Sequence, residues 1–165
     1  MDAGEKGMNH LRLGLDVGLS FKTFENFDQN YVYNVPGNDI GINLIYTRMG
    51  YYGENKDITA GLFATISNIF NQETNVFIIG AGYELRYYYI LGQIEFGYSS
   101  MSKNLPITAS GTLKDVSSPY TSLNGGVEFP IYNKLQIFSI VKYYWWSYSA
   151  NWSRIDIISG LSYTF

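Results

Sequence analysis

The chain has 165 residues, a length that suits a single domain. It contains no Cys, which excludes a disulfide scaffold, a thiol enzyme and a Cys-ligated zinc site. Charged residues make up 15% of the chain, hydrophobic residues 46%, and the formal net charge is -3, so neither a highly charged disordered chain nor a nucleic-acid partner is expected.

The first predicted element covers residues 11–21, where apolar and polar residues alternate strictly. Every odd position is apolar, and the positions between them are Arg, Gly, Asp, Gly and Ser. A period of two residues is typical of a strand with one apolar and one polar face. The pattern therefore predicts a strand and not a helix.

Further alternating segments follow, separated by stretches rich in Asn, Asp, Gly, Pro and Ser. They cover residues 40–46, 58–66, 77–87, 90–98, 123–131, 135–145 and 155–165. Their apolar faces carry no charge, and no convincing amphipathic helix lies between them. The pattern predicts an all-β fold of one domain over residues 1–165: an eight-stranded antiparallel up-and-down barrel, whose closure removes exposed sheet edges.

The connections are expected to alternate in length. Residues 1–9 should form an N-terminal extension, and the long connections should lie at about 22–38, 71–75, 101–119 and 147–151. The tight ones are expected at residues 50–56, near 88–89 and at 132–134.

Two of these tight turns test the register. Ile131 and Leu135 have the same parity across a three-residue loop, so they should pair, and Asn133 tolerates a left-handed conformation there. The apolar parity switches between Tyr87 and Ile90, as a two-residue turn requires. That turn lacks the Gly or Asn usual at such a position, so its exact place stays open.

Alternation alone does not say whether the apolar face of each strand points into the barrel or outward. An inward apolar face would give a soluble, lipocalin-like barrel, and an outward one a barrel in lipid. Three features favour lipid: glycines and charges of both signs suit the narrow interior of an eight-stranded barrel, aromatic residues end the apolar segments, and the segments are long enough to cross a bilayer at a tilt.

These features predict two groups of residues. The charged residues expected in the lumen, as a structural network or a gate, are Arg12, Asp16, Glu84, Glu95, Glu128, Lys142, Arg154 and Asp156. The aromatic residues expected in the girdles at the membrane boundaries are Tyr46, Tyr87, Tyr98, Tyr143, Trp145, Tyr163 and Phe165. Phe63, Phe138, Ile140 and Tyr144 should add bulk inside.

The C-terminal sequence places Leu161, Tyr163 and Phe165 at alternate positions. This ending resembles the signal by which the barrel-assembly machinery recognises bacterial outer-membrane barrels. Together with the alternation, residues 9–165 resemble the small eight-stranded barrels of the OmpA-transmembrane and OmpX kind. The resemblance implies an integral, multi-pass protein of the bacterial outer membrane, with termini and tight turns in the periplasm and long connections outside. It also implies export, so the chain is expected to be a mature form to which Met1 was added.

Function is expected in the extracellular loops, as surface interaction of an adhesion type. The first loop carries Phe24, Phe27, Tyr31 and Tyr33 with Glu25 and Asp28, and the third carries Lys103, Lys114 and Asp115. The expected partners are outer-membrane lipids or lipopolysaccharide, the barrel-assembly machinery, and a host-surface or protein ligand. We expect a monomer with no cofactor and no metal.

The sequence leaves two other functions open. A porin-like narrow channel or transporter for small solutes would use the lumen charges to line its path. A lipid A-modifying enzyme would need a His near the extracellular leaflet, because a hydroxyl nucleophile needs a base. The only histidine, His10, comes just before the first predicted strand at the periplasmic end and has no Ser and acid partner at a telling spacing. We therefore expect no enzyme.

Overall fold

The computed structural model describes residues 8–26, 31–34, 38–52, 55–70, 74–103, 116–146 and 152–165. These ranges hold nine strands: β1 (Met8–Asn26), β2 (Tyr31–Asn34), β3 (Asn38–Tyr52), β4 (Asn55–Phe70), β5 (Thr74–Tyr87), β6 (Ile90–Lys103), β7 (Val116–Tyr132), β8 (Leu135–Trp146) and β9 (Trp152–Thr164). Within the same ranges, the chain has no helix of the length and hydropathy that a membrane crossing requires.

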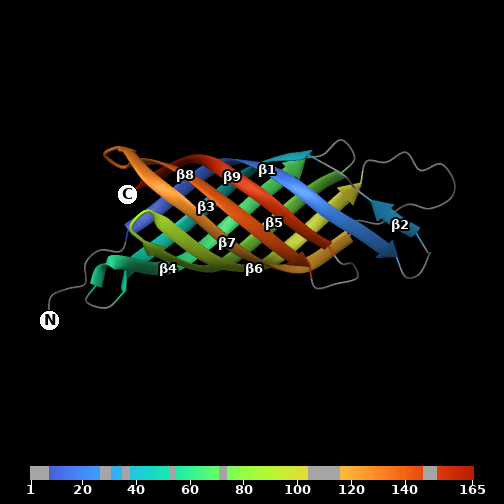
Figure 1. Ribbon diagram of the computed structural model, residues 1–165, viewed down its shortest axis with the longest axis horizontal. Coiled ribbons are helices and arrows are strands. Elements are labelled where there is room, and N and C mark those ends of the chain that lie inside the picture. The colour runs from blue at the N-terminus through green and yellow to red at the C-terminus, as the bar shows by residue number, and fades with distance from the viewer. Residues whose placement is uncertain are drawn as a thin grey trace.

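Eight of the strands form a closed ring. From β3 to β9 each strand pairs antiparallel with the next, and β1 pairs with both β3 and β9. The strands wind at a tilt around one elongated cylinder, with β2 beyond the end opposite the C-terminus (Figure 1). The end that holds the C-terminus and the start of β1 is called the terminal end below. The predicted eight-stranded antiparallel up-and-down barrel is confirmed.

The strands extend further than the apolar pattern predicted. β1 does not end near residue 22 but continues to Asn26, because its backbone pairs with β9 as far as Lys22 and with β2 from Thr23 onward. β6 likewise reaches Lys103, and β7 begins at Val116. Backbone hydrogen bonds do not depend on side-chain alternation, so the ladder continues where the pattern stops. β1 begins at Met8, within the range expected for the N-terminal extension, and residues 1–7 lie outside the described part.

Two tight turns contain a left-handed residue. Tyr88, with φ 51°, lies in the two-residue turn between Tyr87 and Ile90, where the switch of parity predicted it. Asn133, with φ 43°, has the expected left-handed conformation.

The pairing across the second of these turns differs from the prediction. Leu135 pairs with Tyr132 and not with Ile131, and the register shifts between Pro130 and Tyr132. A bulge inserts one extra residue into a strand, so a two-residue turn and a bulge here replace the expected three-residue loop.

The two faces of the barrel point as predicted. Leu13, Leu15 and Leu62 are 57%, 63% and 66% exposed on the outside, whereas Arg12 and Asp16 are fully buried. The lumen also holds apolar side chains in two clusters. One contains Ile45, Phe63, Leu91, Phe138, Ile140 and Ile158, and the other Ile69, Val76, Ile78, Tyr120 and Tyr144.

The side chains in the lumen are so crowded that some inward positions accept only glycine. A Cβ on Gly14 would lie 2.7 Å from Ile158 Cγ2 and 2.8 Å from Phe138 Cζ, closer than real contacts allow. The four bulky residues expected inside, Phe63, Phe138, Ile140 and Tyr144, are all buried.

Candidate functional site in the barrel lumen

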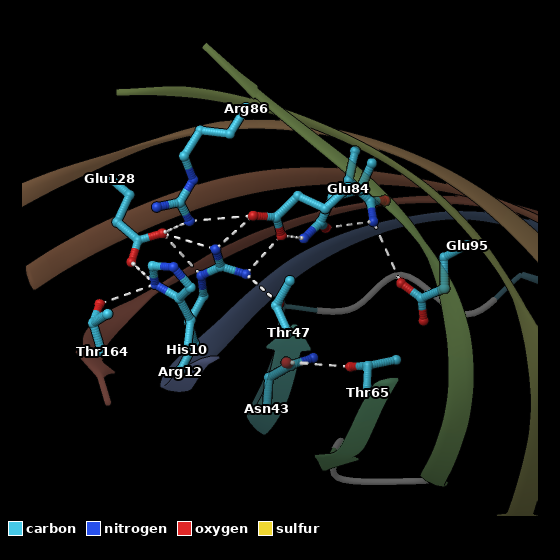
Figure 2. Close-up of polar contacts among 12 residues, drawn as sticks. His10, Arg12, Asn43, Thr47, Thr65, Glu84, Arg86, Glu95, Glu128 and Thr164 are labelled. Carbon is cyan, nitrogen blue, oxygen red and sulfur yellow. Dashed lines mark hydrogen bonds and ion pairs between the residues drawn. The ribbon is translucent and has the colours of Figure 1, made fainter. Parts of the chain in front are cut away.

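Arg12 is the centre of a polar cluster near the terminal end of the lumen. Its guanidinium donates two hydrogen bonds to Glu84 of β5, at 2.7 and 2.8 Å, and two to Glu128 Oε2 of β7, at 2.8 and 3.0 Å. A fifth bond, of 2.9 Å, reaches Thr47 Oγ1 of β3. Figure 2 shows the guanidinium between the two carboxylates. One buried cation from β1 therefore joins four strands across the interior.

Two further side chains complete this network. Arg86 lies 2.5 Å from Glu128 Oε2 and 3.2 Å from Glu84 Oε1 through its Nη2 atom, and Gln93 donates to Glu84 Oε2 at 2.6 Å. Two guanidinium groups thus face two carboxylates. Buried charges are tolerated when they are paired and hydrogen-bonded in this way.

The sequence suggested that His10 is a terminal residue outside the barrel, but the structure places it in the lumen. β1 already begins at Met8, and the even parity that points Arg12 inward also points His10 inward, where it is buried. Its Nδ1 atom lies 3.1 Å from Thr164 Oγ1 and 3.8 Å from Glu128 Oε1. The prediction failed because the apolar alternation, from which the strand was recognised, begins only at Leu11.

A second cluster surrounds Glu95 of β6. Lys142 Nζ of β8 lies 2.7 Å from Glu95 Oε2, and the Tyr120 hydroxyl donates to Glu95 Oε1 at 2.5 Å. Asn124 Nδ2 adds bonds of 3.3 Å to Glu95 and 3.0 Å to Gln93, and so connects this cluster to the first. Sequence reasoning missed Tyr120, although it shares its parity with the inward residues Ser122 and Asn124.

The third cluster contains the remaining predicted lumen charges. Arg154 of β9 donates from Nε to Asp156 Oδ1, and its Nη2 atom lies 4.0 Å from Asp16 Oδ1 of β1. All eight predicted lumen residues are buried inside the barrel, and their contacts place them in these three clusters. Alternation could place each of them inside, but it could not say which would meet.

The chemistry open to these clusters is charge pairing. Among the described residues, no group of three or more His, Cys, Asp or Glu side chains is arranged to hold a metal ion. Glu128 and Thr164 approach the same nitrogen of His10, whereas a base acting on a nucleophile needs the acid on its other nitrogen. These two contacts of His10 therefore differ from the arrangement of an acid, a base and a nucleophile.

The predicted girdle residues lie on the outer face, toward the two ends of the strands. Tyr46, Tyr87, Tyr163 and Phe165 lie toward the terminal end, and Tyr98, Tyr143 and Trp145 toward the other; Tyr143 is half-buried and the rest are exposed. Tyr143 packs edge-on against Trp145 with ring centroids 4.5 Å apart. Leu161 and Tyr163 face outward from β9, and Phe165, which follows the strand, is exposed as well.

A closed eight-stranded barrel with charged residues inside and apolar residues outside is the architecture of small outer-membrane barrels. The attachment invasion locus protein Ail of Yersinia pestis, in a structure with the heparin analogue sucrose octasulfate, matches at a TM-score of 0.60 and 16% identity, covering 98% of this chain and 100% of Ail. Neisserial surface protein A matches at 0.55 and 10%, covering 97% of this chain and 100% of that protein. The N-terminal barrel of Pseudomonas aeruginosa OprF matches at 0.50 and 9%, covering 99% and 100%.

At such identities these likenesses establish the fold. Searches with the sequence find no matching family model and no matching curated protein.

Proposed function

We propose that the chain is an integral protein of the bacterial outer membrane that acts through its loops, as a surface-interaction protein with a closed lumen. The observation that carries this proposal is the outer wall, where large apolar side chains such as Leu13, Leu62 and Ile157 are at least half exposed on strands all around the barrel. Soluble proteins rarely expose apolar patches above a few hundred Å². Lipid is the solvent that such a wall fits.

The filled interior supports a structural barrel over an open pore. Arg12 joins β1, β3, β5 and β7, and the apolar clusters pack Phe138, Tyr144 and other bulky groups between the charged ones. Eight strands leave an interior just wide enough for side chains. A channel for small solutes is the second candidate, because titratable side chains line the lumen from the Arg12 cluster to the Arg154 cluster.

The loops at the end opposite the termini are the proposed contact surface. Of the residues that the sequence pointed to there, Phe24 lies on β1 and Tyr31 on β2, whereas Lys114 lies outside the described part. Ail, named for attachment and invasion, has been crystallised with a sulfated sugar. That likeness supports a host-surface or protein ligand at the loops. We also propose periplasmic termini and delivery by the barrel-assembly machinery through Leu161, Tyr163 and Phe165, as a monomer.

Three measurements test the proposal. A folded barrel in detergent should migrate differently on a gel when it is not boiled, and it should insert into liposomes; good solubility without detergent would contradict membrane residence. Planar-bilayer recordings should show no single-channel steps. Reproducible steps that substitution of Arg12 or Glu128 abolishes would favour the channel.

The adhesion role needs a separate measurement. Cells that express the barrel should bind an immobilised sulfated polysaccharide or host matrix more than cells that express a variant with residues 104–115 replaced by a Gly/Ser linker of equal length. Equal binding by the two would argue against contact through this loop.

A further inference from the structure

Among the strand residues whose side-chain exposure the structure describes, Arg48 is the only charged one on the outer face. It lies on β3, two residues nearer the terminal end than the girdle residue Tyr46, and its side chain is exposed between the buried residues Thr47 and Met49. None of the ion pairs among the described residues includes it. An unpaired guanidinium on a membrane-facing wall needs an anionic partner or water.

The neighbours of Arg48 place it at a boundary between polar and apolar surface. Its backbone pairs with Asn9 of β1 on one side and with Leu62 of β4 on the other. The Tyr46 hydroxyl donates to Asn9 Oδ1 at 2.9 Å, whereas Leu62 is largely exposed. The long Arg side chain can lie along the apolar wall and extend its charge toward the headgroup level.

The outward side chains next to this boundary are unusually short. Along one row of paired residues, Tyr46 of β3 is followed by Ala64 of β4, Ala81 of β5 and Phe96 of β6. Both alanines are exposed, and both flanking rings are exposed as well. The wall over β4 and β5 therefore offers a narrow apolar surface between two aromatic side chains, beside the guanidinium of Arg48.

We infer that Arg48, Ala64 and Ala81 bind one glycerophospholipid with an anionic headgroup, with its phosphate on the guanidinium and an acyl chain over the alanines. The guanidinium presents its donors in a planar fork that matches phosphate oxygens. A net negative headgroup complements the positive charge of Arg48, whereas a zwitterionic lipid brings its own cation. This inference rests on the proposed membrane location of the barrel, and it assigns the lipid to the leaflet at the terminal end.

Native mass spectrometry of the delipidated barrel in mild detergent tests the inference. With added phosphatidylglycerol, wild type should retain one lipid roughly tenfold more tightly than phosphatidylcholine, and Arg48→Gln should lose that preference, since a hydrogen bond to a charged group is worth about this factor. Ala81→Leu, which fills the acyl-chain position, should weaken retention severalfold.

Two control variants make similar substitutions, the loss of a cation and the gain of an apolar side chain, at positions away from the proposed lipid site. Lys134→Gln removes an exposed cation from the turn before β8, and Gly125→Leu adds a side chain at an outward position of β7 where a Cβ meets no neighbour. Both should bind as wild type does. Equal retention of the two lipids by wild type, unchanged binding by Arg48→Gln, or an equal loss in Lys134→Gln would each overturn the site.

The membrane location is checked separately. If wild type inserts into liposomes and shows a heat-modifiable gel shift while Arg48→Gln binds lipid normally, only the lipid site fails. If wild type does not insert, the proposed function fails with it.

Discussion

Arg12 and Glu84 come from strands that are not neighbours in the barrel, and they meet in the lumen as a bidentate pair with N–O distances of 2.7 and 2.8 Å. Glu128 approaches the same guanidinium at 2.8 Å. Breaking a buried pair by removing one partner leaves the other charge uncompensated, at a cost of about 3–5 kcal/mol. We therefore expect Arg12→Met to lower the free energy of unfolding by about that amount, measured by urea titration of the barrel in liposomes.

A combined substitution distinguishes the loss of charge pairing from the loss of side-chain packing. In Arg12→Met combined with Glu84→Gln, Glu128 keeps its contact with Arg86, so no charge is left unpaired at this cluster and a substantial part of the lost stability should return. If the double variant is no more stable than Arg12→Met, the loss comes from packing and not from a buried carboxylate. Lys134→Gln, on an exposed turn, should change stability little.

The Tyr120 hydroxyl should stabilise the barrel through Glu95. It donates at 2.5 Å to a carboxylate that also pairs with Lys142. Removing a donor from a buried charged acceptor costs about 1–3 kcal/mol. Tyr120→Phe should lose stability in that range by the same urea titration, whereas the outward Tyr98→Phe should not. Equal effects of the two substitutions would contradict a role for this hydrogen bond.

The sequence predicted the faces of the strands but not their contacts. Alternation placed Arg12 and Glu84 inside, yet they are 72 residues apart in the chain, and their meeting depends on strand neighbours and on register. The register in turn depends on turns such as the one at Asn133, where a bulge shifted the expected pairing by one residue. Local patterns carry no information about such offsets, because a shift of register along the sheet leaves the alternation within each strand unchanged.

Residues at the edges of a pattern were the ones missed. His10 precedes the first apolar position, and Tyr120 follows a proline that suggested a loop. Extending the inward parity of Arg12 back to residue 10, and that of Ser122 back to residue 120, would have placed both His10 and Tyr120 inside. Arg48 was missed for the opposite reason, because a single charge on an apolar face looks like the end of a strand.

A charge introduced on the outer wall should cost more free energy near the middle of the bilayer than near its surface. Leu15 is exposed on β1, well inside the strand, and Arg near the bilayer midplane of a barrel costs roughly 2–4 kcal/mol. Leu15→Arg should therefore reduce stable insertion into liposomes. Ile131→Arg, exposed beside the terminal-end turn before β8, should cost about 0–1 kcal/mol. Similar losses at both positions would argue against a membrane around the barrel.

The left-handed turn residue Asn133 should be replaceable by Gly but not by Ala. Its φ of 43° is a conformation that Asn and Gly adopt readily, whereas other L-residues pay roughly 1–2 kcal/mol for it. Asn133→Ala should lower the free energy of unfolding by about that amount in liposomes, and Asn133→Gly should stay close to wild type. The exposed side chain at this position makes lost packing a poor explanation for any difference. If Ala and Gly behave alike, the turn has an alternative conformation that relieves the left-handed residue.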